Sequence, residues 1–366
     1  MNDLGELKQF AVAHARAQRL GDHARLLSRM HTDDGDAAGS WVAEWSRAGA
    51  ELEKAGRLLD AAGHYNMARF PFVDGPARQA ALERCVSCFG RWAGEHGIEQ
   101  LELELGGGRV RCWTSGLSPT ARQPLLLVCG GIVSIKEQWA PALPMLRRLG
   151  VAGVAVEMPG VGENTLGYHE DSWRMLPDLL DALAGQADVE QAYALALSFS
   201  GHLALRAAVS DRRIRGVVTV GAPVAEFFSD SSWQARLPRL TVDTLAHLAG
   251  AKTAELSRVL APMALTRAQL ASLDIPVAYT ASERDEIIPA GEVRLLRETV
   301  RNLDVVTHDD VHGSPRHVAE TRLWGALSVL RTRGSGGPRY LLLAAALRLL
   351  RARARFASST RRGSPS

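Results

Sequence analysis

The spacing of hydrophobic residues divides the chain into two parts. From about Leu4 to Gly97, apolar residues recur every three or four positions and β-branched runs are almost absent, which is the period of amphipathic helices. No second copy of any segment follows at a fixed period, which argues against a helical solenoid. The pattern predicts an all-helical N-terminal domain over residues 1–97.

The period changes after Glu99. Two alternating segments, 101–105 and 110–113, flank a glycine turn and predict a β-hairpin. Short apolar runs separated by helical segments then follow, at residues 125–129, 151–156, 193–197, 216–220, 277–280 and 303–307. This order predicts an α/β domain over residues 98–333, with a doubly wound, mostly parallel sheet covered by helices on both faces. Active sites in such sheets lie beyond the carboxyl ends of the strands.

Two segments lie outside this regular alternation. Residues 224–272 are too long for a plain crossover and contain apolar helical patterns, so we expect a helical cap insertion over the active site. Residues 334–366 form a basic C-terminal tail, because the stretch from Arg339 holds seven Arg and no acidic residue. The tail could be an amphipathic helix that contacts an anionic membrane or an acidic carrier protein, or a frayed helix with a disordered end.

Composition narrows the function classes. With 46% hydrophobic and 23% charged residues the chain is typical of a globular protein. The net charge of +3 minus the seven Arg of the tail leaves −4 on residues 1–338, which argues against nucleic-acid binding. The first residues lack a signal-peptide pattern and no apolar run approaches a membrane span, so we expect a cytoplasmic protein without a transmembrane segment.

The four cysteines do not point to a metal site. Cys85 and Cys88 have no second ligand pair at a zinc-like spacing, and with Cys112 and Cys129 they are interpreted as buried thiols. We expect neither a metal nor a cofactor.

The nucleophile candidate follows the strand predicted at 193–197. In a nucleophile elbow the serine lies on a strained strand-to-helix turn, so the residues two before and two after it must be small. Ser198 meets this condition with Ala196 and Ser200, whereas Ser200 as nucleophile would require a histidine at a small position. Ala196 and Ser200 replace the two glycines of the usual G-x-S-x-G pattern.

The acid and base candidates follow the last two predicted strands. Asp285 lies in an acidic turn after residues 277–280, with Glu283 and Glu286 as alternatives. His312 lies on the loop after residues 303–307, while His308 and His317 have simpler structural interpretations. Ser198, Asp285 and His312 thus occur in the chain order of the α/β-hydrolase triad.

A glycine pair indicates where backbone donors for an oxyanion could lie. Gly130-Gly131 follows a predicted strand, so a backbone N–H of Gly131 or Ile132, together with that of Phe199, could bind a developing oxyanion. The Gly-Lys-Ser/Thr part of a P-loop is missing, which argues against a nucleotide site.

These motifs resemble the dihydroxypseudooxynicotine hydrolase group of α/β-hydrolases, which includes fungal pigment-pathway hydrolases that shorten polyketides. The resemblance spans roughly Ala48 to Leu330 and rests on Gly130-Gly-x-x-Ser-x-Lys-Glu137, Met158-Pro-Gly-Val-Gly-Glu163, the Ser198 elbow, Asp285-Glu286 and His312. The elbow departs from the family at Ala196 and Ser200. The resemblance implies hydrolysis of a carbon–carbon bond beside a ketone, an ester or a thioester, in polyketide or aromatic metabolism.

Two other functions stay open at this point. The same triad could catalyse elimination or acyl transfer, including thioester release, and a non-catalytic binding protein could use the same scaffold. The expected partner is a small carbonyl substrate, free or bound to a carrier protein, and a homodimer is left open. Substrate contacts are predicted at four residues of the Pro-Gly-x-Gly-Glu segment and the cap: Glu163, Glu226, Phe227 and Trp233.

Overall fold

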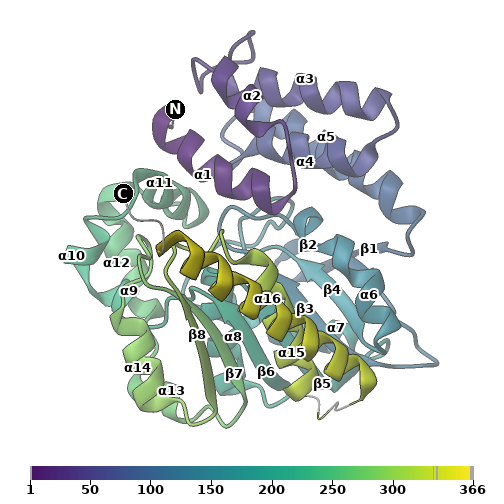
Figure 1. Ribbon diagram of the computed structural model, residues 1–366, viewed down its shortest axis with the longest axis vertical. Helices are drawn as coiled ribbons and strands as arrows, with labels where there is room; N and C mark the ends of the chain where they lie inside the picture. Colours follow the sequence, from purple (N-terminus) through teal and green to yellow (C-terminus); the bar gives the residue numbers. More distant parts are fainter. Residues whose placement is uncertain (1, 333, 335–336, 363–366) are drawn as a thin grey trace.

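The computed structural model describes residues 2–332, 334 and 337–362, which form an eight-stranded sheet with helices on both faces (Figure 1). The strand order is β1-β2-β4-β3-β5-β6-β7-β8. This architecture confirms the predicted α/β-hydrolase fold. The strands are β1 (Glu99–Leu105), β2 (Gly108–Ser115), β3 (Pro124–Cys129), β4 (Ala152–Val156), β5 (Asp188–Ala196), β6 (Ile214–Val220), β7 (Val277–Ser282) and β8 (Leu303–His308).

The sheet combines an antiparallel edge with a parallel body. Strands β1 and β2 form the predicted hairpin, and the turn between them places Gly106 and Gly107 at positive φ, which glycine adopts without a steric penalty. Strand β2 also pairs antiparallel with β4, whereas the pairs from β4 through β3, β5, β6 and β7 to β8 are parallel. The carboxyl ends of these parallel strands therefore meet at one edge.

Alternating residues of the central strands divide the core into two clusters. On β3, Leu125 and Leu127 belong to the larger cluster, whereas Leu126 and Val128 belong to a smaller cluster with Trp324 of α15. This two-residue period is that of a strand buried on both faces. The helices of the α/β domain outside the cap are η1 (Lys136–Gln138), η2 (Ala140–Ala142), α6 (Leu143–Arg148), η3 (Ser172–Arg174), α7 (Met175–Leu183), α8 (Phe199–Ser210), α14 (Gly291–Thr299) and α15 (Val318–Thr332).

The N-terminal domain is helical, as predicted, and lies beyond one end of the sheet (Figure 1). A separate cluster of buried residues that includes Trp41, Trp45 and Phe70 forms its core. The domain reaches the cap, where the backbone N–H of Leu240 donates a 3.0 Å hydrogen bond to Glu6. Its helices are α1 (Leu4–Ala17), α2 (His23–Arg29), α3 (Trp41–Lys54), α4 (Leu58–Arg69) and α5 (Pro76–Gly94).

The segment between β6 and β7, where the cap is predicted, is helical and is held to the rest of the domain by hydrogen bonds near both ends. The buried carboxylate of Glu292 accepts hydrogen bonds from the backbone N–H groups of Val224, Ala225 and Phe227 at 2.9–3.0 Å. The ring of His202 lies 2.8 Å from the carbonyl oxygen of Met263. The helices are α9 (Glu226–Ser229), α10 (Ser231–Gln234), α11 (Arg239–Leu248), η4 (Thr253–Glu255), α12 (Leu256–Leu260), η5 (Ala261–Met263) and α13 (Arg267–Ala271).

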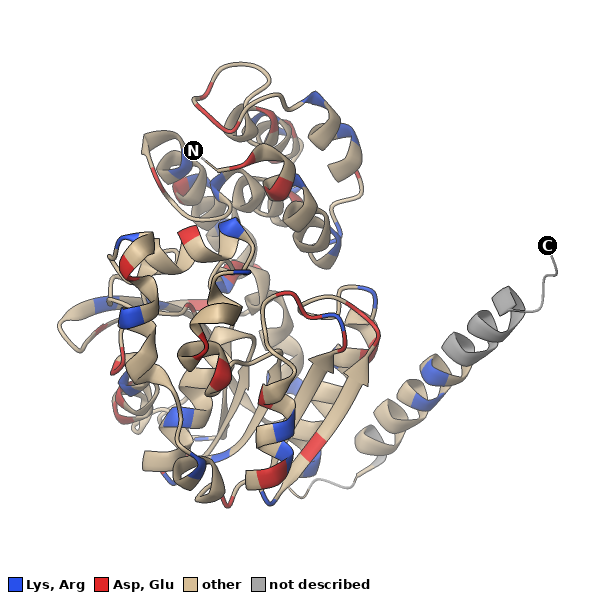
Figure 2. Ribbon diagram, turned by 90° about the vertical axis from the view of Figure 1, so that its left-hand side faces the viewer, with Lys and Arg blue, Asp and Glu red and all other residues tan. Residues whose placement is uncertain are grey.

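The basic tail contains a long helix, α16 (Pro338–Arg362), which crosses in front of the sheet in Figure 1. In Figure 2 the described part of this helix carries Lys or Arg positions, drawn in blue, while positions of both charge signs are interspersed over the rest of the chain. Leu347 is buried against α15, and Arg351 donates a 2.7 Å hydrogen bond to Glu320. Across the described ranges, no helix has the length and apolar character needed to cross a membrane.

Candidate active site

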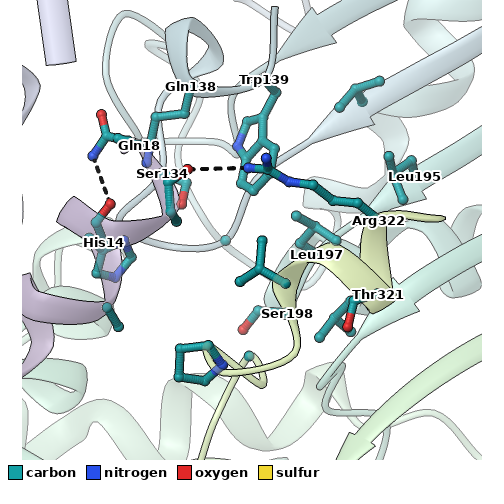
Figure 3. A pocket seen from close by; sticks show the side chains of 18 of the residues that line it. His14, Gln18, Ser134, Gln138, Trp139, Leu195, Leu197, Ser198, Thr321 and Arg322 are labelled. Atoms are coloured by element: carbon teal, nitrogen blue, oxygen red, sulfur yellow. Dashed lines mark hydrogen bonds between the residues drawn. The ribbon is translucent and has the colours of Figure 1, made fainter. Parts of the chain in front are cut away.

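Ser198 lies on a strained turn between β5 and α8. Its φ of 57° and ψ of −127° place a non-glycine residue in a sparsely populated region of backbone space. Such strain is tolerated because the turn is fixed on both sides: the N–H of Ser198 donates to the Val220 carbonyl at 2.8 Å, and the N–H of Gly201 donates to the Ser198 carbonyl at 2.8 Å. The turn directs the side chain of Ser198 out of the sheet and into a cavity (Figure 3).

The two departures from G-x-S-x-G are accommodated without distortion. The Ser200 hydroxyl donates to the carbonyl oxygens of Cys129 and Leu197, both at 3.0 Å. It is therefore bound to the backbone and does not contact His312. The glycine that this turn requires is Gly201, because a Cβ there would lie 2.0 Å from Thr219 Oγ1. The position two residues after Ser198 must hold a small residue, and the small side chain of Ser200 fits there while it forms hydrogen bonds to backbone carbonyls.

Three side chains from distant loops form one hydrogen-bonded chain. Ser198 Oγ and His312 Nε2 are 3.0 Å apart, and His312 Nδ1 is 3.0 Å from each carboxylate oxygen of Asp285. The N–H groups of Ile287 and Ile288 donate to Asp285 Oδ1 at 3.0 and 2.8 Å, which fixes the carboxylate. The structure therefore brings together the three residues predicted from the sequence.

The charges around His312 favour the protonated form of its imidazole. Burial lowers the pKa of His312, but the charge and hydrogen bond of Asp285, together with the charge of Glu286, outweigh burial and hold this pKa above its ordinary value. Glu286 accepts a 3.0 Å hydrogen bond from the backbone N–H of His312, and Glu283 is exposed to solvent. Of the three acidic residues considered in this turn, Asp285 is the one that contacts the ring.

Two glycines permit the close approach of these groups. A Cβ on Gly221 would lie 2.8 Å from His312 Cε1, and a Cβ on Gly131 would lie 3.1 Å from Ser198 Cβ. Within the described residues, the backbone N–H groups of Phe199 and Ile132 have no acceptor. Both are therefore available as donors beside Ser198.

The cavity that contains Ser198 has a volume of about 1640 Å³. Its walls come from the N-terminal domain, from α11 of the cap and from the sheet face under α15. Figure 3 shows His14 of α1 and Gln18, which follows α1, on one side and Thr321 and Arg322 of α15 on the other. Burial lowers the pKa of His14 to about 4, assisted by the charges of Arg69 and His312, so this imidazole is neutral at pH 7. The α1 and α15 residues carry no motif, and sequence reasoning missed them.

The predicted contact residue Glu163 belongs to a different feature, a buried charge cluster. Lys136 Nζ lies 2.8 Å from Glu163, 3.1 Å from Glu137 and 3.3 Å from Glu157. Lys136 and Glu157 are fully buried, and Trp113 donates a 2.7 Å hydrogen bond to Glu137. The Gly-Gly-x-x-Ser-x-Lys-Glu and Pro-Gly-x-Gly-Glu segments therefore meet in an ionic scaffold beneath the Gly131 loop.

The three predicted contact residues of the cap also lie outside the cavity. Phe227 is fully buried and packs edge-on against Phe199. Trp233 donates a 2.8 Å hydrogen bond to the carbonyl of Ile287, and the carboxylate of Glu226 lies against Gly291 at the start of α14. Together with Glu163, these residues support the walls of the site and do not line it.

The cysteines and acidic residues offer no metal site in the part of the chain that the structure describes. Cys85, Cys88, Cys112 and Cys129 are buried free thiols, and no group of three metal-ligating side chains occurs within this part.

Comparisons with known proteins agree with this fold. The solved structure AbyA5 Wildtype is 54% identical, covers 95% of this chain and 100% of its own, and superposes with a TM-score of 0.92. The 2,6-dihydroxy-pseudo-oxynicotine hydrolase is 19% identical, covers 87% of this chain and 95% of its own, and has a TM-score of 0.69. At this identity the second likeness concerns the fold, and it confirms the resemblance inferred from the motifs.

Sequence relatives point the same way. The Esterase FrsA of Vibrio vulnificus (strain YJ016) is 22% identical over 306 residues, which cover 75% of this chain and 74% of that one. The family described as Esterase FrsA-like matches residues 22–273, more than half of the chain. The protein therefore belongs to the FrsA-like esterase family and is a hydrolase of the α/β-hydrolase superfamily.

Proposed function

We propose that the protein hydrolyses a bulky, mostly apolar carbonyl substrate with Ser198 as nucleophile, His312 as base and Asp285 as the group that orients the imidazole. The observation that supports this proposal is the unbroken chain of 3.0 Å contacts from Asp285 through His312 to Ser198. A serine hydroxyl becomes an effective nucleophile when an adjacent imidazole removes its proton.

The chemical steps follow from these contacts. Ser198 Oγ attacks the carbonyl carbon while its proton passes to His312 Nε2, and the oxyanion is stabilised by the N–H groups of Phe199 and of Gly131 or Ile132. His312 then donates this proton to the leaving oxygen as the bond to the leaving group breaks. A water molecule activated by His312 attacks the acyl-serine, which releases the acid and restores Ser198.

The substrate class is inferred from the cavity. Its volume of about 1640 Å³ exceeds the roughly 300–1,000 Å³ common for small-molecule sites and its walls are mostly apolar, which favours a large carbonyl compound of the kind made in polyketide or aromatic metabolism. An ester is the first choice because the family is an esterase family. A thioester, or a carbon–carbon bond beside a ketone, would use the same acyl-serine, with a thiolate or enolate as leaving group.

The proposal is tested with two variants of the same turn. We expect Ser198→Ala to abolish labelling by a fluorophosphonate probe and to lower kcat by roughly 10⁴-fold or more. Ser200→Ala is the matched control and should still be labelled, because Ser200 bonds to backbone carbonyls instead of His312. A folded wild-type protein that resists the probe would favour a non-catalytic binding role.

Product analysis separates hydrolysis from the alternatives. In ¹⁸O-labelled water, hydrolysis should place one labelled oxygen in the released acid. A product without labelled oxygen would instead indicate elimination or acyl transfer by the same residues.

A further inference from the structure

Arg322 of α15 extends over the cavity above Ser198 (Figure 3). Among the described residues, its guanidinium donates a long hydrogen bond, 3.3 Å, from Nη2 to the carbonyl of Ala17 at the end of α1. No carboxylate in the described chain forms an ion pair with this guanidinium. The side chain is exposed to solvent at the cavity wall, and because Arg has several N–H donors in a planar fork, donors remain free to bind a ligand there.

The charges near Arg322 are positive like its own, which favours binding of an anion. Arg19 and Arg236 line the same cavity, and neither forms an ion pair within the described residues. Burial and the nearby charge of Arg19 both lower the pKa of Arg322, as expected for like charges that face each other. Of the lining carboxylates, Glu6 and Glu286 accept backbone N–H groups, from Leu240 and His312 respectively. The other two pair elsewhere, Asp60 with Arg57 and Glu137 with Lys136.

The wall next to Arg322 also holds polar atoms without partners. Thr321 Oγ1 and Thr280 Oγ1 line the cavity, are buried and have no hydrogen-bond partner in the described chain, and the same is true of Trp139 Nε1. Buried polar groups are normally hydrogen-bonded, and leaving one unpaired is costly. A ligand oxygen bound at this wall would pair with the hydroxyl of Thr321, the chain neighbour of Arg322, together with the guanidinium.

Building on the proposed function, we propose that the substrate carries an anionic oxygen group, such as a carboxylate, which binds Arg322 and the Thr321 hydroxyl while its ester carbonyl is held at Ser198. The apolar part of the substrate then lies against the sheet face under α15, which Leu126, Val128, Leu195 and Val218 form. The substrate class is an amphiphilic acid ester.

The experiment compares pairs of esters in which one member carries a free carboxylate and the other is neutral. 4-Nitrophenyl hydrogen glutarate and 4-nitrophenyl butyrate differ by a carboxylate on the acyl side. 4-Acetoxybenzoate and its methyl ester differ by a carboxylate on the alcohol side. We expect the wild-type enzyme to prefer the anionic member of at least one pair by roughly tenfold in kcat/KM, the scale of a charge-assisted hydrogen bond.

Variants of Arg322 test the source of this preference. Arg322→Gln should remove it mainly through a higher KM, while kcat/KM for the neutral esters stays within about twofold. Arg322→Lys keeps the charge without the planar fork and should retain part of the preference. Arg174→Gln is the control, because this exposed arginine pairs with Asp171.

Three results would overturn the inference: no preference in either pair, a preference that survives in Arg322→Gln, or equal losses for neutral and anionic esters. The last would mean that Arg322 only caps α1 through the Ala17 carbonyl. These results remain distinct from failure of the proposed function, in which Ser198→Ala would leave the turnover of every ester unchanged.

Discussion

At the scale of single residues, the site depends on the proton affinity of one imidazole. In the proposed mechanism His312 acts as a base only when neutral, so activity should fall as the pH drops below its pKa. Because Asp285 and Glu286 raise this pKa against the effect of burial, the acid limb of the pH profile should have its midpoint above the ordinary value of 6.5.

Glu286→Gln tests this electrostatic effect. The amide can still accept the backbone N–H of His312 but carries no charge, so the pKa of His312 should fall and activity should persist to lower pH. The measurement is kcat/KM between pH 4.5 and 9. Glu283→Gln, an exposed neighbour in the same turn, should leave the profile unchanged. An unshifted limb in Glu286→Gln would show that Glu286 does not act on the ring.

A second prediction at this scale concerns Gly221. Alanine there would place its Cβ 2.8 Å from His312 Cε1 and would also strain a backbone with φ of 59°, so the imidazole must move away from Ser198. We expect Gly221→Ala to lower kcat by roughly tenfold or more, since small displacements of catalytic groups are costly.

Gly250→Ala separates the effect of displacing the imidazole from the effect of backbone strain. Gly250 has a φ of 58° with no atom within 4 Å of its added Cβ, so this variant should lose about 1 kcal/mol of stability with kcat unchanged. Equal kcat values for the two variants would contradict the predicted clash with His312.

At the scale of elements, the loop after β3 is held by the ionic scaffold around Lys136. The loop carries Gly131 and Ile132, and η1 behind it supplies Lys136 and Glu137, which meet Glu157 and Glu163 from the segment after β4. Burial raises the pKa of Glu157 to about 7, and the charge of Lys136 opposes this rise. The lysine therefore favours the ionised form of the buried carboxylates.

Lys136→Met should destabilise the protein by about 3–5 kcal/mol, because it leaves buried carboxylates without a cation. Without Lys136 the folded-state pKa of Glu157 rises further above its unfolded value. The stability that Glu157 contributes is present below its pKa in the unfolded chain and is lost as the pH rises. The variant should therefore lose more free energy of unfolding, relative to the wild type, at pH 8 than at pH 5. Denaturant unfolding at the two pH values measures this.

Arg111→Met is the control for this cluster. Arg111 pairs with Glu163 from a more exposed position, so its loss should change stability by about 0–1 kcal/mol at either pH. A pH-independent deficit in Lys136→Met would contradict the predicted protonation of the carboxylates.

At the scale of the whole molecule, the N-terminal domain forms part of the site. Arg69 of α4 is buried and donates hydrogen bonds to the carbonyls of Val133, in the Gly131 loop, and of Pro71, at 2.5 and 3.0 Å. Its Nε donates to Asn66 Oδ1 at 2.8 Å. A single side chain thus connects the helical domain to the loop that provides the proposed oxyanion donors.

Arg69→Met should lower kcat by roughly tenfold with little change in KM, because the loop loses its fixed position where charge develops in the transition state. Arg78→Met is the matched control. Arg78 is also buried, but its hydrogen bonds go to Asp33, Asp74 and Phe70 within the same domain, so this variant should lose stability and keep kcat. A loss of kcat in both variants would mean that domain stability, and not the contact with Val133, controls the loop.

The sequence by itself determined the fold and the positions of the proposed nucleophile, base and acid. Hydrophobic period distinguishes helix from strand through local geometry, and Ser198, Asp285 and His312 are recognisable because each follows a predicted strand. Glu163, Glu226, Phe227 and Trp233 were misplaced because an acidic or aromatic residue near a motif can equally support a wall from behind.

Only the tertiary structure decided which side chains line the cavity. His14 and Arg322 are more than three hundred positions apart and lie in ordinary helical patterns, so nothing local indicates that both face Ser198. The N-terminal domain lies beyond one end of the sheet and α15 packs on one of its faces, and together these placements bring the two residues there. Such long-range contacts depend on the relative placement of whole elements, which local hydrophobic period does not encode.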